Sequence, residues 1–193
     1  MNIIMYTLFM RSDAQKNYTS LLVAADEAFT ELGAEASLEE IARRAHVGIG
    51  SLYRHFPTRQ QLVRAVFVRW HEELIRKAEI LTQTDDSLKA LMQWLTLLLA
   101  ISERYQGIKG SLFTAGEPTV SNLDKLQTQT REAGQKLLHN AQKQGVIRSD
   151  ITIDEVIAVV HGIGVALSLI EQVDDVRILD ILLYGMASSD YKH

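Results

Sequence analysis

The stretch SLEEIARRAHVGIGSLYRHFP, residues 37–57, holds two short helical patterns divided by a tight break. Ser37 and Glu40 have the spacing of a capping box, in which the serine hydroxyl and the glutamate carboxylate bind backbone N–H groups that a helix start leaves unpaired. A helix is therefore expected to begin here. Its apolar face is predicted to consist of Leu38, Ile41, Ala42 and Ala45.

The second pattern, IGSLYRHF at residues 49–56, is barely two turns long. Leu52 and Phe56 are placed at helical spacing to pack inward. Pro57 is expected to end this helix, because the residue before a proline avoids the α-helical region. The outer side of the helix is left with Ser51, Tyr53, Arg54 and His55.

This arrangement favours a helix-turn-helix. Such a unit needs two short helices, a tight turn, and hydrogen-bond donors on the second helix, which enters the major groove of DNA. Hydroxyl, phenol, guanidinium and imidazole groups supply the donors, and Gly48 and Gly50 allow the backbone to approach DNA closely. The alternative is a helical hairpin whose basic face is only solvated.

The positive charge of the chain is concentrated in this region. The formal net charge is −4, which by itself does not indicate a nucleic-acid partner. Residues 41–70, however, contain six arginines and no acidic residue, whereas residues 81–193 contain ten lysines and arginines against fourteen acidic residues. The positive field is therefore expected to be confined to one segment.

The stretch SLEEIARRAHVGIGSLYRHFPTRQQLVRAVF, residues 37–67, resembles the DNA-binding domain of the tetracycline-repressor (TetR) family. The family pattern includes the core IA..AGV..GTLYRHF..KE.L, and the resemblance extends from Ala24 to Val68. It implies an all-α fold, with an N-terminal three-helix DNA-binding domain of helix-turn-helix type followed by a C-terminal helical domain for ligand binding and dimerisation.

The resemblance also implies which residues contact double-stranded DNA. They are Ser37 at the start of the second helix, Gly48, Ile49 and Gly50 at the tip of the recognition helix, Ser51, Tyr53 and His55 at phosphate or groove contacts, and Arg59 at the start of the fourth helix. At Ser51 the family more often has threonine, and serine keeps the hydroxyl.

Few side chains of the recognition helix can read bases. The two glycines have no side-chain donors, so direct readout falls to Ile49 against a thymine methyl and to Arg54 or Ser51 at a base edge. Most contacts are therefore expected to reach phosphate. Affinity for the operator should then fall steeply with salt.

One residue departs from the family pattern. His46 stands where the family usually has glycine in the turn. If this position needs a positive φ, histidine carries a modest strain that glycine avoids. His46 either is a solvated turn residue or reaches a phosphate.

We expect three segments. Residues 1–12 are predicted to form a flexible arm, residues 13–57 the helix-turn-helix domain, and residues 58–193 the ligand-binding and dimerisation domain, with the helix at 58–80 as connector. The first helix is expected from about Asp13 to Leu32, closed by Gly33. Met5 and Met10 are alternative starts to Met1. Further helical patterns lie at 86–105, 120–144, 153–171 and 174–187.

The segment VIAVVHGIGVALSLI, residues 156–170, is apolar on every side of a helix. Such a helix is buried on every side, either in the protomer core or at a subunit interface. The resemblance implies a homodimer through the last two long helices, which presents two recognition helices about 34 Å apart to a pseudo-palindromic site. The predicted interface residues are Val160, Gly164, Leu167, Leu179, Leu182 and Leu183.

An apolar and aromatic set between these two regions is a candidate pocket for a small-molecule inducer. Its residues are Met92, Trp94, Leu98, Tyr105, Phe113, Leu138 and His139, with Leu95, Leu99 and Leu137 beside them. Tyr105 or His139 would orient a polar group of an apolar or aromatic ligand. The alternative is that these residues are ordinary core.

Several function classes are disfavoured. The chain has no cysteine, which removes thiolate nucleophiles and cysteine-bound zinc and fits a reducing cytoplasm. HEEL at residue 71 lacks the second histidine of a zinc-protease helix, and no glycine-rich phosphate loop occurs. The apolar leader is too short to span a bilayer, which takes about 20 residues. We therefore expect a cytoplasmic repressor without enzymatic activity, cofactor, metal or membrane partner.

Overall fold

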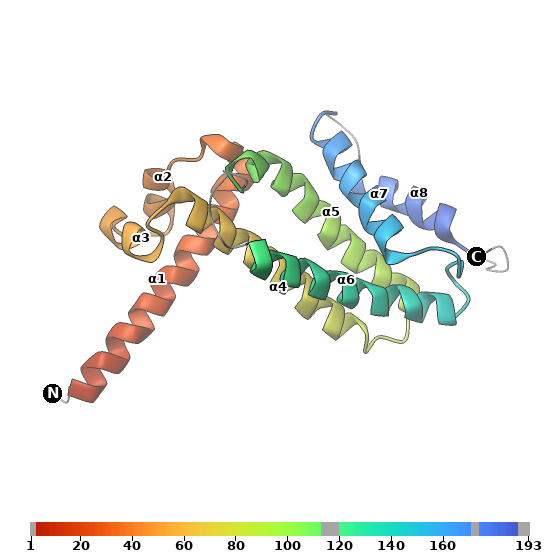
Figure 1. The fold of residues 1–193 in the computed structure, drawn as a ribbon, viewed down its shortest axis with the longest axis horizontal. Coiled ribbons are helices and arrows are strands. Elements are labelled where there is room, and N and C mark those ends of the chain that lie inside the picture. The colour runs from red at the N-terminus through yellow and green to blue at the C-terminus, as the bar shows by residue number, and fades with distance from the viewer. Residues whose placement is uncertain (1–2, 113–119, 171–173, 189–193) are drawn as a thin grey trace. The chain divides into compact units, whose positions relative to one another are not determined.

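The computed structural model is built of helices, as the sequence predicts (Figure 1). It describes residues 3–112, 120–170 and 174–188 of the 193-residue chain. Within these ranges the extended pairing is limited to an isolated bridge between Ile147 and Ala187. The elements are α1 (Ile3–Leu32), the 3-10 helix η1 (Gly33–Glu35), α2 (Leu38–Arg44), α3 (Ile49–His55), α4 (Arg59–Leu81), α5 (Ser87–Leu112), α6 (Val120–Lys143), α7 (Ile153–Leu167) and α8 (Asp175–Met186).

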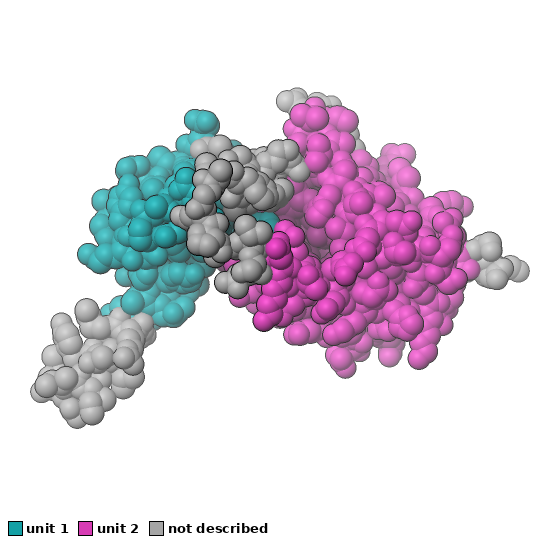
Figure 2. Space-filling model, in the orientation of Figure 1, with its two compact units in different colours: residues 1–67, 107–115 teal, residues 68–106, 116–193 magenta. Residues whose placement is uncertain are grey.

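The chain forms two compact units (Figure 2). Unit 1 comprises residues 1–67 and 107–115, and unit 2 comprises residues 68–106 and 116–193. The division falls inside α4, after residue 67; the domain boundary expected after Pro57 stays a prediction. The first turns of α4 bury Leu62, Val63 and Val66, so they belong to the same compact unit as the helices before them.

Helices α1, α2 and α3 pack in sequence order to build unit 1. Helix α1 packs against α2, and α2 packs against α3. Of the inward faces predicted for the two short helices, Ile41, Ala42, Leu52 and Phe56 are buried, whereas Leu38 and Ala45 are half-buried. The N-terminal region is therefore a helix-turn-helix with a core of its own.

Helix α1 begins earlier than expected. A flexible arm is expected at residues 1–12 and a helix start near Asp13, but α1 starts at Ile3. Residues 3–12 contain neither proline nor glycine, so nothing in the sequence interrupts the helix. In Figure 1 these first turns extend away from α2 and α3. Their mobility stays a prediction.

Helix ends follow the sequence signals closely. Gly33 after α1 and Gly145 after α6 have φ of 55° and 73°, the left-handed conformation that glycine adopts without a steric cost. Thr152 caps α7 with a full capping box: its hydroxyl accepts from the Glu155 N–H at 3.3 Å, and the Glu155 carboxylate accepts from the Thr152 N–H at 2.8 Å.

Unit 2 is held together by close helix contacts. Trp94 of α5 is fully buried, and its indole N–H donates to the carbonyl of Leu74 in α4 at 3.0 Å. A Cβ atom at Gly134 of α6 would overlap the six-membered ring of Trp94. A Cβ atom at Gly164 of α7 would lie 2.8 Å from Cβ of Ser102 in α5. Both glycines are therefore required for this packing.

The described residues contain neither a candidate membrane span nor a candidate metal site. No helix in residues 3–112, 120–170 and 174–188 is long and apolar enough to cross a bilayer. The same residues contain no group of three or more histidine or carboxylate side chains placed to hold a metal ion.

Candidate nucleic-acid interface

Helix α2 starts with half of the predicted capping box. The Ser37 hydroxyl accepts a hydrogen bond from the Glu40 N–H at 3.1 Å. The Glu40 carboxylate does not return to the backbone of Ser37. It accepts hydrogen bonds from Arg43 and Arg44, each at 2.8 Å. These two guanidinium groups lower the pKa of Glu40 to about 2.

The same contacts reduce the positive field that the sequence suggests. Arg44 also pairs with Glu31 of α1 at 2.8 Å. Glu40 and Glu31 lie just outside the acid-free segment in sequence, yet they neutralise two of its arginines in the fold. The arginine count over residues 41–70 therefore overstates the charge available to DNA, because it ignores partners from earlier in the chain.

The turn between α2 and α3 contains the one non-glycine residue with positive φ among the described residues. His46 has φ of 54° and is exposed. The turn therefore needs a positive φ at this position, where the family usually has glycine. Histidine carries the modest strain that glycine would avoid. Gly48 then precedes α3 as its N-cap, without a side-chain cap.

Helix α3 has a buried side and an exposed side. Leu52 and Phe56 are 0% and 3% exposed. Tyr53 is 46% and Ile49 38% exposed, which are high values for apolar and aromatic side chains. Gly48 and Gly50, with no other atoms within 4 Å of a Cβ position, and Arg54 complete this exposed surface.

Two polar side chains of α3 contact each other. A terminal guanidinium nitrogen of Arg54 donates to the Ser51 hydroxyl at 2.6 Å. Arg54 is exposed and Ser51 is half-buried. The arginine is therefore held in one direction along the outer side of the helix.

His55 lies beside an aromatic contact to α1. Its ring meets Tyr18 edge-on, with centroids 5.9 Å apart, and Tyr18 stacks on Phe56 at 5.2 Å. His55 is half-buried. It therefore fixes the position of α3 against α1 and presents only part of its ring to solvent.

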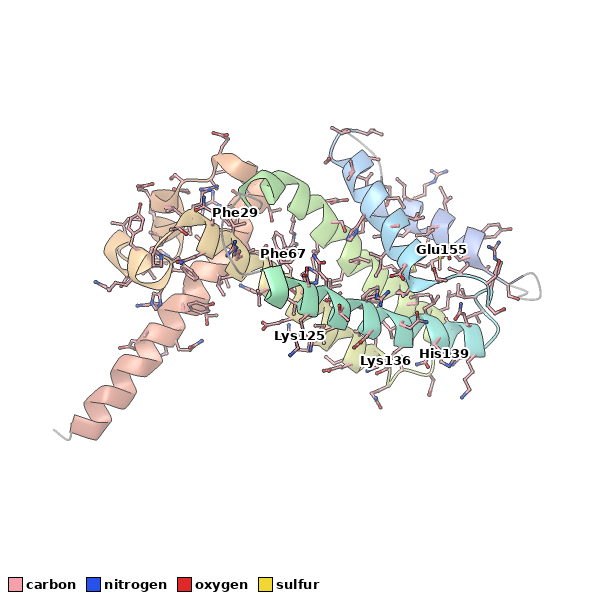
Figure 3. All side chains as sticks on the ribbon, in the orientation of Figure 1. Phe29, Phe67, Lys125, Lys136, His139 and Glu155 are labelled. Atoms are coloured by element: carbon pink, nitrogen blue, oxygen red, sulfur yellow. The ribbon has the colours of Figure 1, made fainter. Side chains whose placement is uncertain are left out.

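Arg59 is engaged inside unit 1. Its guanidinium donates to the carbonyl of Ala36 and lies 5.2 Å from the centre of the Phe29 ring, a residue of α1 that Figure 3 labels. Burial lowers the pKa of Arg59. A phosphate contact by Arg59 would have to compete with these partners, so its first role is to join α4 to the start of α2.

The residues predicted for the inducer pocket fall into four groups. Trp94, Leu98 and Leu138 are buried in the core of unit 2, as are Leu95, Leu99 and Leu137. Met92 lines a groove of about 400 Å³ with Leu88, Leu183 and Tyr184. His139 is exposed on α6 (Figure 3). The side chain of Tyr105 and all of Phe113 lie outside the described residues.

Sequence reasoning missed a polar contact inside unit 2. The Nδ1 atom of His71 in α4 lies 2.8 Å from the Thr130 hydroxyl in α6. Thr130 uses its own proton on the carbonyl of Leu126, so the His71 N–H is the donor. Burial, together with the nearby charge of His161 in α7, lowers the pKa of His71 to about 4. Burial also lowers the pKa of His161.

The dimer residues predicted in α7 and α8 are mostly on the inward side of the protomer, and their place in an interface stays a prediction. Val160, Leu179 and Leu183 are buried within unit 2, and Gly164 packs against Ser102. Leu167 and Leu182 are half-buried. An all-apolar helix gives no periodic signal to separate its two sides. The exposed apolar residues of this region, called here the α7–α8 face, are Val159, Val165, Leu169, Ile170, Ile181 and Tyr184.

Comparisons with known proteins agree with this architecture. Residues 21–66 match the family of bacterial regulatory proteins of the tetR type. Residues 86–188, more than half of the chain, match the C-terminal domain of SbtR-like transcriptional regulators. A search of curated proteins found no match.

Solved structures match along most of the chain. A TetR transcriptional regulator from Streptomyces coelicolor is 29% identical, with a TM-score of 0.73 over 89% of this chain and 99% of that chain. A TetR regulatory protein from Mycobacterium vanbaalenii is 25% identical, with a TM-score of 0.72 over 92% and 99%. A gamma-butyrolactone receptor of ArpA-like type, 23% identical with a TM-score of 0.60 over 91% of each chain, shares the fold.

The two matched segments coincide with the helix-turn-helix of unit 1 and with the helices of unit 2 after α4. From its helix-turn-helix, its helical second unit and these matches, the chain belongs to the TetR family of DNA-binding transcriptional regulators.

Proposed function

We propose that this regulator represses transcription by binding a pseudo-palindromic operator as a homodimer, and that a small apolar or aromatic molecule bound in unit 2 releases it. The observation that carries the proposal is the outer side of α3, where Tyr53, Arg54, Ile49 and two glycines are exposed together. Donors and open backbone on one helical face suit the major groove.

The DNA contacts divide by the environment of each residue. Tyr53 and Ser51 supply hydroxyl groups for phosphates, with Ser37 at the exposed start of α2. Gly48, Ile49 and Gly50 approach the bases. His55 and Arg59 are partly occupied within unit 1, so they mainly position α3 and α4. Phosphate contacts dominate the affinity and make it salt-dependent.

The α7–α8 face supports the homodimer. Its exposed fractions reach 66% for Ile181, 72% for Tyr184 and 80% for Leu169. An exposed apolar surface of this kind marks a site of protein association, and a twofold axis places the same surface on both partners. Leu167 and Leu182 would lie at the edge of this contact.

Ligand control is proposed for unit 2. The groove of about 400 Å³ between the start of α5 and α8 has Leu88, Met92, Leu183 and Tyr184 on its apolar walls, which suits a small apolar or aromatic ligand. Helix α4 runs through both units, so a shift of α4 on ligand binding would alter the recognition helix. Coupling of this kind requires different ligand affinities in the two arrangements.

The first experiment measures binding of the purified protein to DNA from its own upstream region. Wild type should prefer this fragment over an unrelated duplex, with affinity that falls as salt rises. Tyr53→Phe should weaken binding by about 10- to 100-fold, as expected for a lost hydrogen bond to a charged group. Arg76→Ala, which removes an exposed arginine of α4 in unit 2, is the control and should bind as wild type does. Absence of binding to any DNA at low salt would refute the proposal.

Ligand control is tested separately against the alternative of a constitutive regulator or one controlled by a protein partner. A ligand at about 100 times its Kd stabilises the native state by about 2.7 kcal/mol, so a thermal-shift screen of apolar and aromatic compounds should find ligands that raise the Tm. Met92→Trp, which fills the groove, should reduce that shift. A ligand that raises the Tm without reducing operator affinity would contradict release by induction.

A further inference from the structure

We infer that Arg54, held in place by Ser51, reads a guanine in each half-site of the operator. This inference rests on the proposed function, because it requires α3 to enter the major groove. It specifies the base that the recognition helix selects, and it assigns reader and positioning roles to two neighbouring side chains.

The direction of Arg54 follows from the buried side of α3. A helix turns by about 100° per residue, so Gly50 and Arg54 lie about 160° and 200° from the buried Leu52. They are therefore opposite the core, on the side that meets base edges when a recognition helix docks. Ser51 and Tyr53 lie on the two flanks of the helix, where the phosphate backbones pass. Gly50 has nothing within 4 Å of its Cβ position and leaves room beside Arg54.

The partners of Arg54 distinguish it from neighbouring arginines. Arg43 and Arg44 are ion-paired with Glu40, and Arg59 is bound to a backbone carbonyl. Arg54 instead donates one hydrogen bond to the neutral hydroxyl of Ser51, at 2.6 Å. Among the described residues no carboxylate pairs with Arg54, so its charge and its other N–H donors face outward.

Guanine is the base that matches this group. A guanidinium is a donor only. The major-groove edge of guanine offers two acceptors, O6 and N7, whereas adenine pairs its N7 acceptor with an N6 donor that would oppose arginine. Arginine contacts guanine in bidentate fashion, and such a pair is the commonest specific contact in the major groove.

Ser51 acts as the positioning residue. A free arginine side chain samples many rotamers, and part of the binding free energy is lost when it is ordered. The hydrogen bond from Arg54 to Ser51 orders the guanidinium before DNA arrives. Removal of the Ser51 hydroxyl should therefore weaken the choice of base, whereas threonine, which keeps a hydroxyl on the same carbon, should restore it.

The test uses the full chain and an operator obtained by selection from random duplexes with the wild-type protein. Each guanine of the half-site is then replaced in turn by 7-deazaguanine, which removes the N7 acceptor and keeps base pairing. For wild type, one position per half-site should show a loss of affinity of at least about fivefold. Arg54→Ala and Arg54→Lys should bind more weakly and lose this position dependence.

The serine variants complete the test. Ser51→Ala should reduce the effect of 7-deazaguanine, and Ser51→Thr should retain it. Circular dichroism confirms that each variant is folded, and Arg76→Ala is again the matched arginine control.

Four results would overturn the inference. If Arg54→Ala weakens binding equally at all sequences and lowers the salt slope by about one unit, Arg54 contacts a phosphate. If Ser51→Ala discriminates as wild type does, Ser51 does not position Arg54. If wild type selects no sequence, the proposed function fails together with this inference. Sequence-selective binding that is unchanged in Arg54→Ala refutes this inference alone.

Discussion

The outer side of α3 and the α7–α8 face are both exposed, but they expose opposite chemistry. Helix α3 presents a phenol, a guanidinium and open glycines, whereas α7 and α8 present aliphatic side chains and Tyr184. Water satisfies the polar groups of α3 when DNA is absent. Water forms no hydrogen bonds with the aliphatic face, and burial of that face is favourable by about 25 cal/mol per Å². The outer side of α3 therefore suits a partner that binds reversibly, and the α7–α8 face suits a permanently bound partner.

A charge placed on the α7–α8 face should have the largest effect on the protein. Ile181 is 66% exposed, so Ile181→Glu should leave the protomer folded. In the proposed dimer the new carboxylate would be buried without a partner, which costs several kcal/mol. We therefore expect dimerisation to weaken by at least about 100-fold, measured by analytical ultracentrifugation, with operator binding lost in parallel.

Ile80 provides the matched control for this prediction. It is 61% exposed on α4, outside the α7–α8 face. Ile80→Glu should therefore keep the mass and the operator affinity of wild type. A monomeric wild-type protein, or an Ile181→Glu variant that remains dimeric, would contradict the assignment of the interface.

Acid should lower the stability contributed by unit 2 and by unit 1 over different pH ranges. Burial lowers the pKa of His71 in unit 2 from 6.5 to about 4, so the unfolded state binds a proton first and stability is lost as pH falls between these values. For Glu40 in unit 1 the corresponding range is 4.5 to about 2. The His71 range should cost roughly 2 kcal/mol, measured as the urea midpoint at pH 7 and pH 4.5.

His71→Asn isolates this contribution. Asparagine keeps an N–H donor toward Thr130 and does not titrate. The stability of the variant should therefore change less than that of wild type between pH 7 and pH 4.5. Equal pH dependence in both proteins would show that another group is responsible.

Two glycines of α7 sharpen the distinction between its inner and outer sides. A Cβ atom at Gly164 would lie 2.8 Å from Ser102 Cβ, whereas the position at Gly162 has nothing within 4 Å. Gly164→Ala should destabilise the protein by about 1–3 kcal/mol through overpacking. Gly162→Ala should stabilise the helix by about 0.5–1 kcal/mol. Thermal unfolding measures both, and effects of the same sign would show that the two sides are assigned incorrectly.

The smallest expected effect concerns the turn before α3. His46 has φ of 54° and is exposed, and an L-residue in this conformation costs about 1–2 kcal/mol relative to glycine. His46→Gly should therefore raise the free energy of unfolding by about 1 kcal/mol. Operator affinity should stay the same if His46 is only a solvated turn residue. A fall in affinity beside the rise in stability would identify a phosphate contact instead.

The sequence predicts burial best where a helix has one apolar, buried side and one polar, exposed side. The spacing of Leu52 and Phe56 predicts their inward position, and Pro57 predicts the end of α3; the structure agrees with both. In α7 every position is apolar except His161 and the residues near its start, so spacing could not separate Val160, which is buried, from Val159, which is exposed. Pattern reasoning depends on contrast between sides, and α7 has little.

Contacts between distant residues were also out of reach. His71 and Thr130 are 59 positions apart in the chain, and neither lies in a recognisable motif. The Glu40 carboxylate has three possible partners within four residues: the Ser37 N–H, Arg43 and Arg44. The predicted capping box is incomplete because the carboxylate binds the two guanidinium groups and not the backbone N–H. The position of Glu40 at the start of α2 is predictable from the sequence. Its hydrogen-bond partner depends on which donors compete for the carboxylate in the folded chain.

The distribution of tryptophan has a practical consequence. The chain has two tryptophans, and both, Trp70 and Trp94, are fully buried in unit 2. Selective excitation of indole therefore reports on unit 2, while unit 1 gives no indole fluorescence. A single tryptophan introduced into unit 1 of a variant that lacks the native pair would give the opposite view. Tryptophan fluorescence from the two proteins would then follow changes in unit 2 and in unit 1 separately, in real time, as ligand or operator is added.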